Sequence, residues 1–245
     1  MRRLVIKAAA GLVFCLALCG SLRADSVTVG ALNAANCYPF LCNDSGTSTG
    51  QSILYQQVYG ANNFSTPFVI DSLTFLFAPS FCGNGTVLDG NYSISFSYTS
   101  APVNGLSTDL GSNIGAGSAL FFNGSLGGTL GNPSFTIDGT PFIYDPANGN
   151  LLMTITVTNQ QALVNPSDRG YDVADNNGDK TSRAYVVGPG STGGLTDGEG
   201  LVTQFTGPTT DPPTAVAPEP ASLLLISTGL LVLGGRARKL LNLKR

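Results

Sequence analysis

The sequence predicts an all-β fold: a two-sheet antiparallel sandwich of the jelly-roll kind, flanked by an N-terminal signal peptide and a short C-terminal transmembrane helix. The chain of 245 residues contains 31 glycines, and Ser, Thr and Asn fill the spaces between its apolar segments. This composition is typical of an all-β protein with many turns. No segment between the two targeting regions has a helical period, whereas several alternate with the period of a strand. Eight such strands, each with an apolar and a polar face, fit two packed sheets.

The first 24 residues are typical of a secretory signal peptide. Three basic residues near the start precede an apolar stretch of about 12 residues, which is too short for an ordinary membrane span. Small residues follow this stretch, so we expect cleavage after Ser21 or Ala24. The β-sandwich ectodomain is then predicted to cover residues 25–206.

The predicted strands are clearest where apolar and polar residues alternate. In "NYSISFSYTS" (91–100) aromatic and aliphatic residues share one face while Ser and Thr share the other, and "LLMTITVTN" (151–159) has the same pattern. In "FVIDSLTFLF" the alternation changes phase at Asp71 and Ser72, which predicts a bulge or turn. Weaker strands are expected at 52–59, 118–124, 133–139, 183–188 and 200–206.

Charge and composition exclude several classes of function. All 15 acidic residues but only three of the 12 basic residues lie between positions 25 and 219, which gives this region a net charge of −12. Such a region cannot neutralise phosphates, so we expect no nucleic-acid partner and no adhesion to an anionic membrane surface. The chain contains no His and no Trp. Without an imidazole base, the commonest hydrolase and zinc chemistries are excluded, and the protein is predicted not to be an enzyme.

Three cysteines remain after removal of the predicted signal peptide: Cys37, Cys42 and Cys82. An odd number permits one internal disulfide and one leftover thiol. A Cys37–Cys42 bond would close the short "CYPFLC" turn, and we favour it. Pairings that use Cys82 remain open.

One loop has the composition of a cation site. Within residues 167–183, the spacing of Asp175, Asn177 and Asp179 reproduces the first three ligand positions of a calcium loop. The pattern then departs, because Lys180 replaces the expected Gly and Val186 replaces the bidentate Glu. We therefore expect no cofactor and an exposed turn rich in Asp and Asn, with calcium as the alternative.

The C-terminal region is predicted to be a linker followed by a membrane segment. Residues 207–220, "GPTTDPPTAVAPEP", contain five prolines and should form an extended tether. Residues 221–245 begin with about 15 mostly apolar residues, which as a helix of about 22 Å fall short of the roughly 30 Å hydrocarbon core. The basic residues after it would halt translocation and orient the ectodomain outward; they are Arg236, Arg238 and Lys239.

This end of the chain resembles the PEP-CTERM sorting domain of exported proteins in bacteria that make exopolysaccharide. The resemblance depends on Pro218-Glu219-Pro220, then "ASLLLISTGLLVLGG", then "RARK", and covers about the last 30 residues. It implies recognition by an exosortase, a membrane-embedded processing enzyme, with cleavage near the triplet. It also implies transient anchoring in the membrane and delivery to the cell surface or extracellular matrix.

These observations predict a non-enzymatic surface or matrix protein that is structural in the envelope or biofilm matrix. The alternative is a carbohydrate-binding module for the cell's own exopolysaccharide. Because Trp is absent, such a module would need exposed tyrosines as stacking platforms, and the candidates are Tyr38, Tyr59 and Tyr171.

Overall fold

The computed structural model describes residues 24–31, 34–40, 51–76, 86–130, 134–161, 171–174, 180–188 and 193–208. The chain divides into two compact units, Met1–Thr210 and Asp211–Arg245, and every described residue belongs to the first. Within these ranges no helix has the length and apolar character needed to cross a membrane. The predicted signal peptide and C-terminal helix lie outside the described residues, except that Ala24 is already part of a strand.

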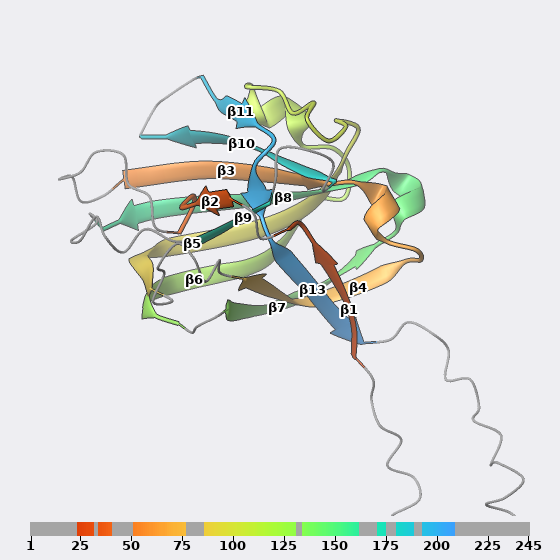
Figure 1. The fold of residues 1–245 in the computed structure, drawn as a ribbon, viewed down its shortest axis with the longest axis horizontal. Coiled ribbons are helices and arrows are strands. Elements are labelled where there is room, and N and C mark those ends of the chain that lie inside the picture. The colour runs from red at the N-terminus through yellow and green to blue at the C-terminus, as the bar shows by residue number, and fades with distance from the viewer. Residues whose placement is uncertain are drawn as a thin grey trace, which may run out of the picture. The chain divides into compact units, whose positions relative to one another are not determined.

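The described residues form an all-β fold with two main antiparallel sheets, as the sequence predicts (Figure 1). The four-stranded sheet has the order β1 (Ala24–Val29), β13 (Thr203–Pro208), β4 (Phe68–Leu76), β7 (Ser134–Tyr144). The six-stranded sheet has the order β11 (Leu195–Asp197), β10 (Thr181–Val187), β3 (Gln51–Tyr59), β8 (Asn150–Gln160), β5 (Thr86–Thr99), β6 (Ala119–Thr129). A smaller sheet joins β12 (Gly200–Leu201), β9 (Tyr171–Ala174) and β2 (Ala34–Asn36). Short 3-10 turns lie at Ala61–Asn63 (η1), Leu110–Asn113 (η3) and Pro146–Asn148 (η4).

The strand pairing is that of a jelly roll. Strand β1 pairs with β13, β3 with β8, β4 with β7 and β5 with β6, and all four pairs are antiparallel. The pairs are therefore nested, as when one long hairpin is folded over into two sheets. Strands β10 and β11 extend the six-stranded sheet beyond β3. The predicted jelly-roll sandwich is confirmed in the described part of the chain.

Aromatic side chains from both inner faces fill the space between the sheets. Phe40 lies 4.9 Å from Phe75 and 5.0 Å from Phe135, measured between ring centroids, and both contacts are within the preferred range for aromatic pairs. Tyr92 and Phe96 of β5 are fully buried, which confirms the inner face predicted from alternation. This core fixes which side chains of each strand face solvent.

Some element boundaries differ from the sequence prediction. The phase change in β4 is confirmed as a register shift between Ile70 and Ser72. Strand β5 begins at Thr86, earlier than predicted. The sequence-based prediction misses these first residues because a register shift between Val87 and Gly90 interrupts the alternation there. Strand β13 continues to Pro208, so the first two residues assigned to the linker are part of the sheet.

The outer face of the six-stranded sheet is not entirely polar, and the prediction that it would be is wrong for one half. Leu106 and Leu110, from the connection between β5 and β6, form an apolar cluster on this face with Val58, Leu152 and Ala184. Gln56 Nε2 donates to the Leu110 carbonyl at 3.0 Å and Asn113 Nδ2 donates to Gln56 Oε1 at 2.9 Å. These bonds fasten the connection over one half of the sheet and leave the other half uncovered by it.

Candidate functional site

The uncovered half of this face carries a regular set of uncharged hydrogen-bonding side chains, which we call the first polar array. It consists of Asn91 and Ser93 on β5, Asn123 and Ser125 on β6, and Thr156 and Thr158 on β8. Asn91 stands opposite Thr158 and Ser125, and Ser93 stands opposite Thr156 and Asn123. Neighbouring positions are therefore about 5 Å apart across the strands and about 7 Å apart along them. Five of the six side chains are exposed and Ser93 is half-buried.

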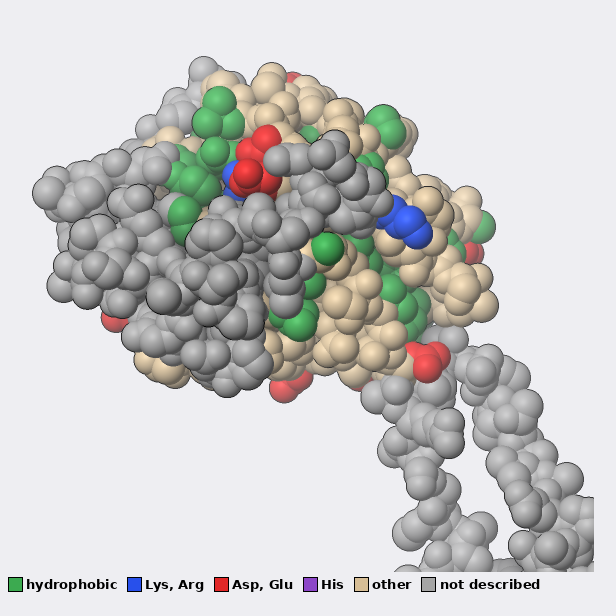
Figure 2. Space-filling model, viewed as in Figure 1, with side chains coloured by type: hydrophobic (Ala, Val, Ile, Leu, Met, Phe, Trp, Pro, Cys, Tyr) green, Lys and Arg blue, Asp and Glu red, His purple; other side chains and the backbone are tan. Residues whose placement is uncertain are grey.

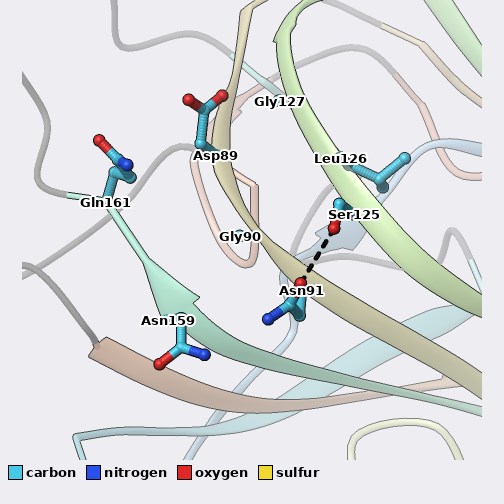
Figure 3. Close-up of a pocket in the computed structure, with 8 residues that line it drawn as sticks. All are labelled: Asp89, Gly90, Asn91, Ser125, Leu126, Gly127, Asn159 and Gln161. Atoms are coloured by element: carbon cyan, nitrogen blue, oxygen red, sulfur yellow. Dashed lines mark hydrogen bonds between the residues drawn. The ribbon is translucent and has the colours of Figure 1, made fainter.

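The array is partly ordered by its own hydrogen bonding. Ser125 Oγ donates to Asn91 Oδ1 at 3.0 Å, the bond that Figure 3 marks with a dashed line. This bond uses one acceptor of Asn91 and leaves its amide nitrogen able to donate to a ligand. The array therefore offers both donors and acceptors from a rigid sheet.

An open pocket of about 420 Å³ lies at the end of the array, and we call it the end pocket (Figure 3). Its residues come from the start of β5, the last part of β6 and the end of β8; they are Asp89, Gly90, Asn91, Ser125, Leu126, Gly127, Asn159 and Gln161. The Gln161 backbone N–H donates to the Asp89 carbonyl at 2.8 Å, which ties the end of β8 to the bulged start of β5.

Local backbone geometry shapes the end pocket. A Cβ atom at position 127 would collide with the Asp89 carboxylate, so only glycine permits this close approach of β6 to β5. Asn159 has a φ of 56°, a left-handed conformation that Asn tolerates better than most residues. The sequence predicted neither feature, because both depend on how β5, β6 and β8 lie beside one another.

The described side chains of the end pocket are mainly neutral hydrogen-bonding groups. Among the described residues that line it, Asp89 is the only carboxylate, and the other polar side chains are amides and one hydroxyl. Glycoside hydrolysis ordinarily needs a pair of carboxylates. Within the described residues no group of three or more His, Cys, Asp or Glu could hold a metal ion.

The other notable polar cluster surrounds Arg183, on the inward side of β10. Its Nε donates to Asp197 Oδ1 at 2.8 Å and its Nη2 donates to Glu199 Oε2 at 2.7 Å. Burial alone would lower the pKa of Arg183, but its hydrogen bond with Asp197 and the nearby carboxylates raise it instead. The guanidinium also lies 4.8 Å from the centroid of the Tyr185 ring. The cluster fastens the β11–β12 segment to the sheet edge, and we assign it a structural role.

Most of the predicted site residues lie outside the described ranges. Cys37 is disulfide-bonded, but its partner is not among the described residues, so the pairing with Cys42 stays a prediction. The candidate calcium ligands and the sorting elements also lie outside; they are Asp175, Asn177, Asp179, Pro218, Glu219, Pro220, Arg236, Arg238 and Lys239.

The predicted tyrosine platforms are wrong for two of the three candidates. Tyr38 is 7% exposed and stacks on Tyr185 at 4.7 Å, and Tyr59 is fully buried against Phe205 at 4.8 Å. Burial raises the pKa of Tyr59 well above its usual value, which agrees with a core position. The side chain of Tyr171 lies outside the described set. The sequence did predict outward-facing Thr on β8, but it could not show which polar residues of β5 and β6 lie beside them.

Comparison with known protein families identifies a sorting motif near the C-terminal end of the sequence. Residues 216–239 match the PEP-CTERM protein-sorting motif, which marks the chain for export and for processing by an exosortase at the membrane. No curated protein sequence matches the chain.

A weak resemblance is found to a solved structure. It contains the cysteine protease and lectin-like domains of Cwp84, a surface layer associated protein of Clostridium difficile. The TM-score is 0.35 with 8% sequence identity, over 65% of this chain and 32% of that one. The present chain thus matches about a third of that protein's length, and a likeness at this level carries no argument about function.

Proposed function

We propose that this exported, exosortase-processed protein is a non-enzymatic component of the cell surface or matrix that binds neutral polysaccharide through the first polar array. The observation that carries the proposal is the array itself: six uncharged hydrogen-bonding side chains on three adjacent strands, continuing into the end pocket. Hydroxyl-rich chains present donors and acceptors at short intervals, and a rigid array of both can pair with them without ordering mobile side chains first.

Charge supports a neutral ligand. Charged residues make up 11% of the chain, well below the roughly 25% of an ordinary soluble domain. On the face drawn in Figure 2 the described surface is mostly uncharged, with isolated acidic and basic groups. The net charge of −12 between residues 25 and 219 disfavours polyanions, whereas a neutral polymer meets no such repulsion.

A structural role and a binding role fit together here. A matrix protein that holds neutral polymer contributes to the matrix without chemistry, which is supported by the single carboxylate among the described lining residues of the end pocket and by the lack of His in the chain. The array contains no aromatic ring, so affinity for a single sugar should be low. Binding would then depend on contacts repeated along a chain of sugars.

The test removes two array hydroxyls without changing side-chain shape. Thr156→Val with Thr158→Val keeps β-branched residues on the exposed face of β8, so the fold should be retained. Each lost hydrogen bond contributes about 0.5–1.5 kcal/mol, and two together predict a loss of affinity of roughly 5- to 150-fold. Titration calorimetry of the surface-released protein with neutral polysaccharide purified from the producing cells measures this change.

Thr196→Val is the matched control, because Thr196 is an exposed threonine on β11 of the same sheet but outside the array. The control should bind as the wild type does. The proposal would be wrong if the wild type bound neither this polysaccharide nor any neutral glycan in a glycan microarray. It would also be wrong if the Thr156→Val/Thr158→Val variant bound with unchanged affinity.

A further inference from the structure

The outer face of the four-stranded sheet carries a second polar array. One row runs across all four strands through Thr28, Gln204, Thr74 and Thr136, and the next through Ser26, Thr206, Ser72 and Asp138. Seven of these eight side chains are uncharged. Four are exposed and four are half-buried, and each row follows the strand register without a break.

Hydrogen bonds also order this array. Gln204 Nε2 donates to Thr28 Oγ1 at 3.3 Å, and the hydroxyls of Thr74 and Thr136 bond to each other at 2.7 Å. Each bond joins neighbouring strands, so the polar groups are held in the spacing of the sheet. Hydroxyls that bond to each other keep a free acceptor for a ligand.

We propose that the second polar array is a second binding surface for neutral, hydroxyl-rich polymer, so that one protein molecule bridges two polysaccharide chains. This inference rests on the proposed function of the first array. The two arrays lie on the outer faces of a sandwich whose sheets pack about 10 Å apart, so they face in opposite directions. A chain on one face leaves the other face open to a second chain.

The composition of the surface favours a polysaccharide over a second copy of the protein. Stable protein interfaces bury about 800 Å² on each partner around an apolar centre. Among the described residues, the apolar side chains that border the second array are Val69, Leu76 and Ile143, of which Ile143 is 71% exposed. They lie beside the array and give it no apolar centre. Asp138 and the net negative charge of the ectodomain oppose binding of a polyanion.

The test counts binding sites. A neutral oligosaccharide cut from the producing cells' polysaccharide is titrated into wild-type protein, the Thr156→Val/Thr158→Val variant and a Thr28→Val/Thr136→Val variant. We expect two oligosaccharides per wild-type molecule and one strong site in each variant. Beads coated with the polysaccharide should be agglutinated by the wild type, whereas each variant should bind the beads and lose agglutination.

Sedimentation velocity separates bridging by one molecule from bridging by a dimer. The inference requires that the wild type agglutinate beads as a monomer. It is overturned if only one oligosaccharide binds, if the Thr28→Val/Thr136→Val variant agglutinates as the wild type does, or if bridging occurs only with a dimer. Binding of one oligosaccharide that depends on Thr156 and Thr158 would overturn this inference alone and leave the first array's function intact.

Discussion

The buried ion pair at the edge of the six-stranded sheet gives the sharpest test of the packing. The side chain of Arg183 is 6% exposed, whereas those of Asp197 and Glu199 are 34% and 29% exposed. Asp197→Ala therefore leaves a buried guanidinium with one carboxylate. Removing one partner of a buried pair costs about 3–5 kcal/mol, and because Glu199 remains we expect about 3 kcal/mol here.

The double variant Arg183→Met/Asp197→Ala should be more stable than Asp197→Ala alone. Methionine fills the space of the aliphatic part of Arg183 and removes the buried charge. The double variant should therefore lose only about 1 kcal/mol of unfolding free energy relative to the wild type. The two substitutions should thus couple by about 2 kcal/mol or more, which is the sign of a direct interaction. Arg183→Lys keeps the charge but cannot reproduce the bidentate hydrogen bonding to Asp197. Its loss of stability should lie between those of Asp197→Ala and the double variant.

Urea unfolding followed by circular dichroism measures these differences, since the chain has no Trp to report by fluorescence. For a domain of this size a loss of 3 kcal/mol lowers the midpoint by about 1 M. Asp138→Ala is the control: this exposed carboxylate makes no ion pair within the described residues, and it should change stability by less than about 0.5 kcal/mol. A cost below 1 kcal/mol for Asp197→Ala, or a double variant less stable than Asp197→Ala, would refute this account.

Three further predictions concern processing, alkaline stability and strand approach. Glu219→Ala should leave export intact but prevent removal of the C-terminal segment; mass spectrometry showing that the wild-type released protein still ends at Arg245 would contradict this. Burial raises the pKa of Tyr92, so the folded state resists its ionisation, and the contribution of Tyr92 to stability should be constant below about pH 10 and fall above it. Tyr92→Phe should make that fall shallower by up to about 1.4 kcal/mol per pH unit in thermal melts, and an unchanged slope would contradict this. Gly207→Ala would force a Cβ atom against the Val69 carbonyl and should cost at least about 2 kcal/mol of unfolding free energy. In the control Gly193→Ala the added Cβ meets no atom within 4 Å, so stability should not change. Equal melting temperatures for the two variants would refute this difference.

Local alternation predicted the parts of the fold that depend on neighbouring residues in the sequence. The inner and outer faces of β5 and β8 follow from a period of two, because each strand packs one face on the core. The phase change at Asp71 marks a true bulge for the same reason: an extra residue must reverse the alternation if both halves of β4 are to face the core.

What the sequence could not predict depends on contacts between distant segments. Leu106 and Leu110 lie in a stretch rich in Gly and Ser without strand or helix periodicity, so nothing local shows that they cover the outside of a sheet. Both polar arrays depend on strand register, since Asn91 and Thr158 become neighbours only when β5 and β8 pair. Tyr59 illustrates the converse error: the sequence-based prediction names it as an exposed stacking platform, yet its hydroxyl bonds to Thr203 inside the core.

The fold places the end pocket and the last residue of β13 at opposite ends of the sandwich. Phe40 contacts both Tyr92 and Phe75, so the end of β4 lies at the same end of the sandwich as the start of β5 and the end pocket. Strand β13 begins opposite Phe75 at Thr203 and runs away from that end to Pro208, about 17 Å further along the sheet. Strand β13 therefore ends at Pro208, at the end of the sandwich opposite the end pocket and beside the start of β1, with which Pro208 is paired (Figure 1). The two arrays lie on the outer faces of the sandwich, so the proposed binding surfaces and the end of strand β13 occupy different parts of the fold.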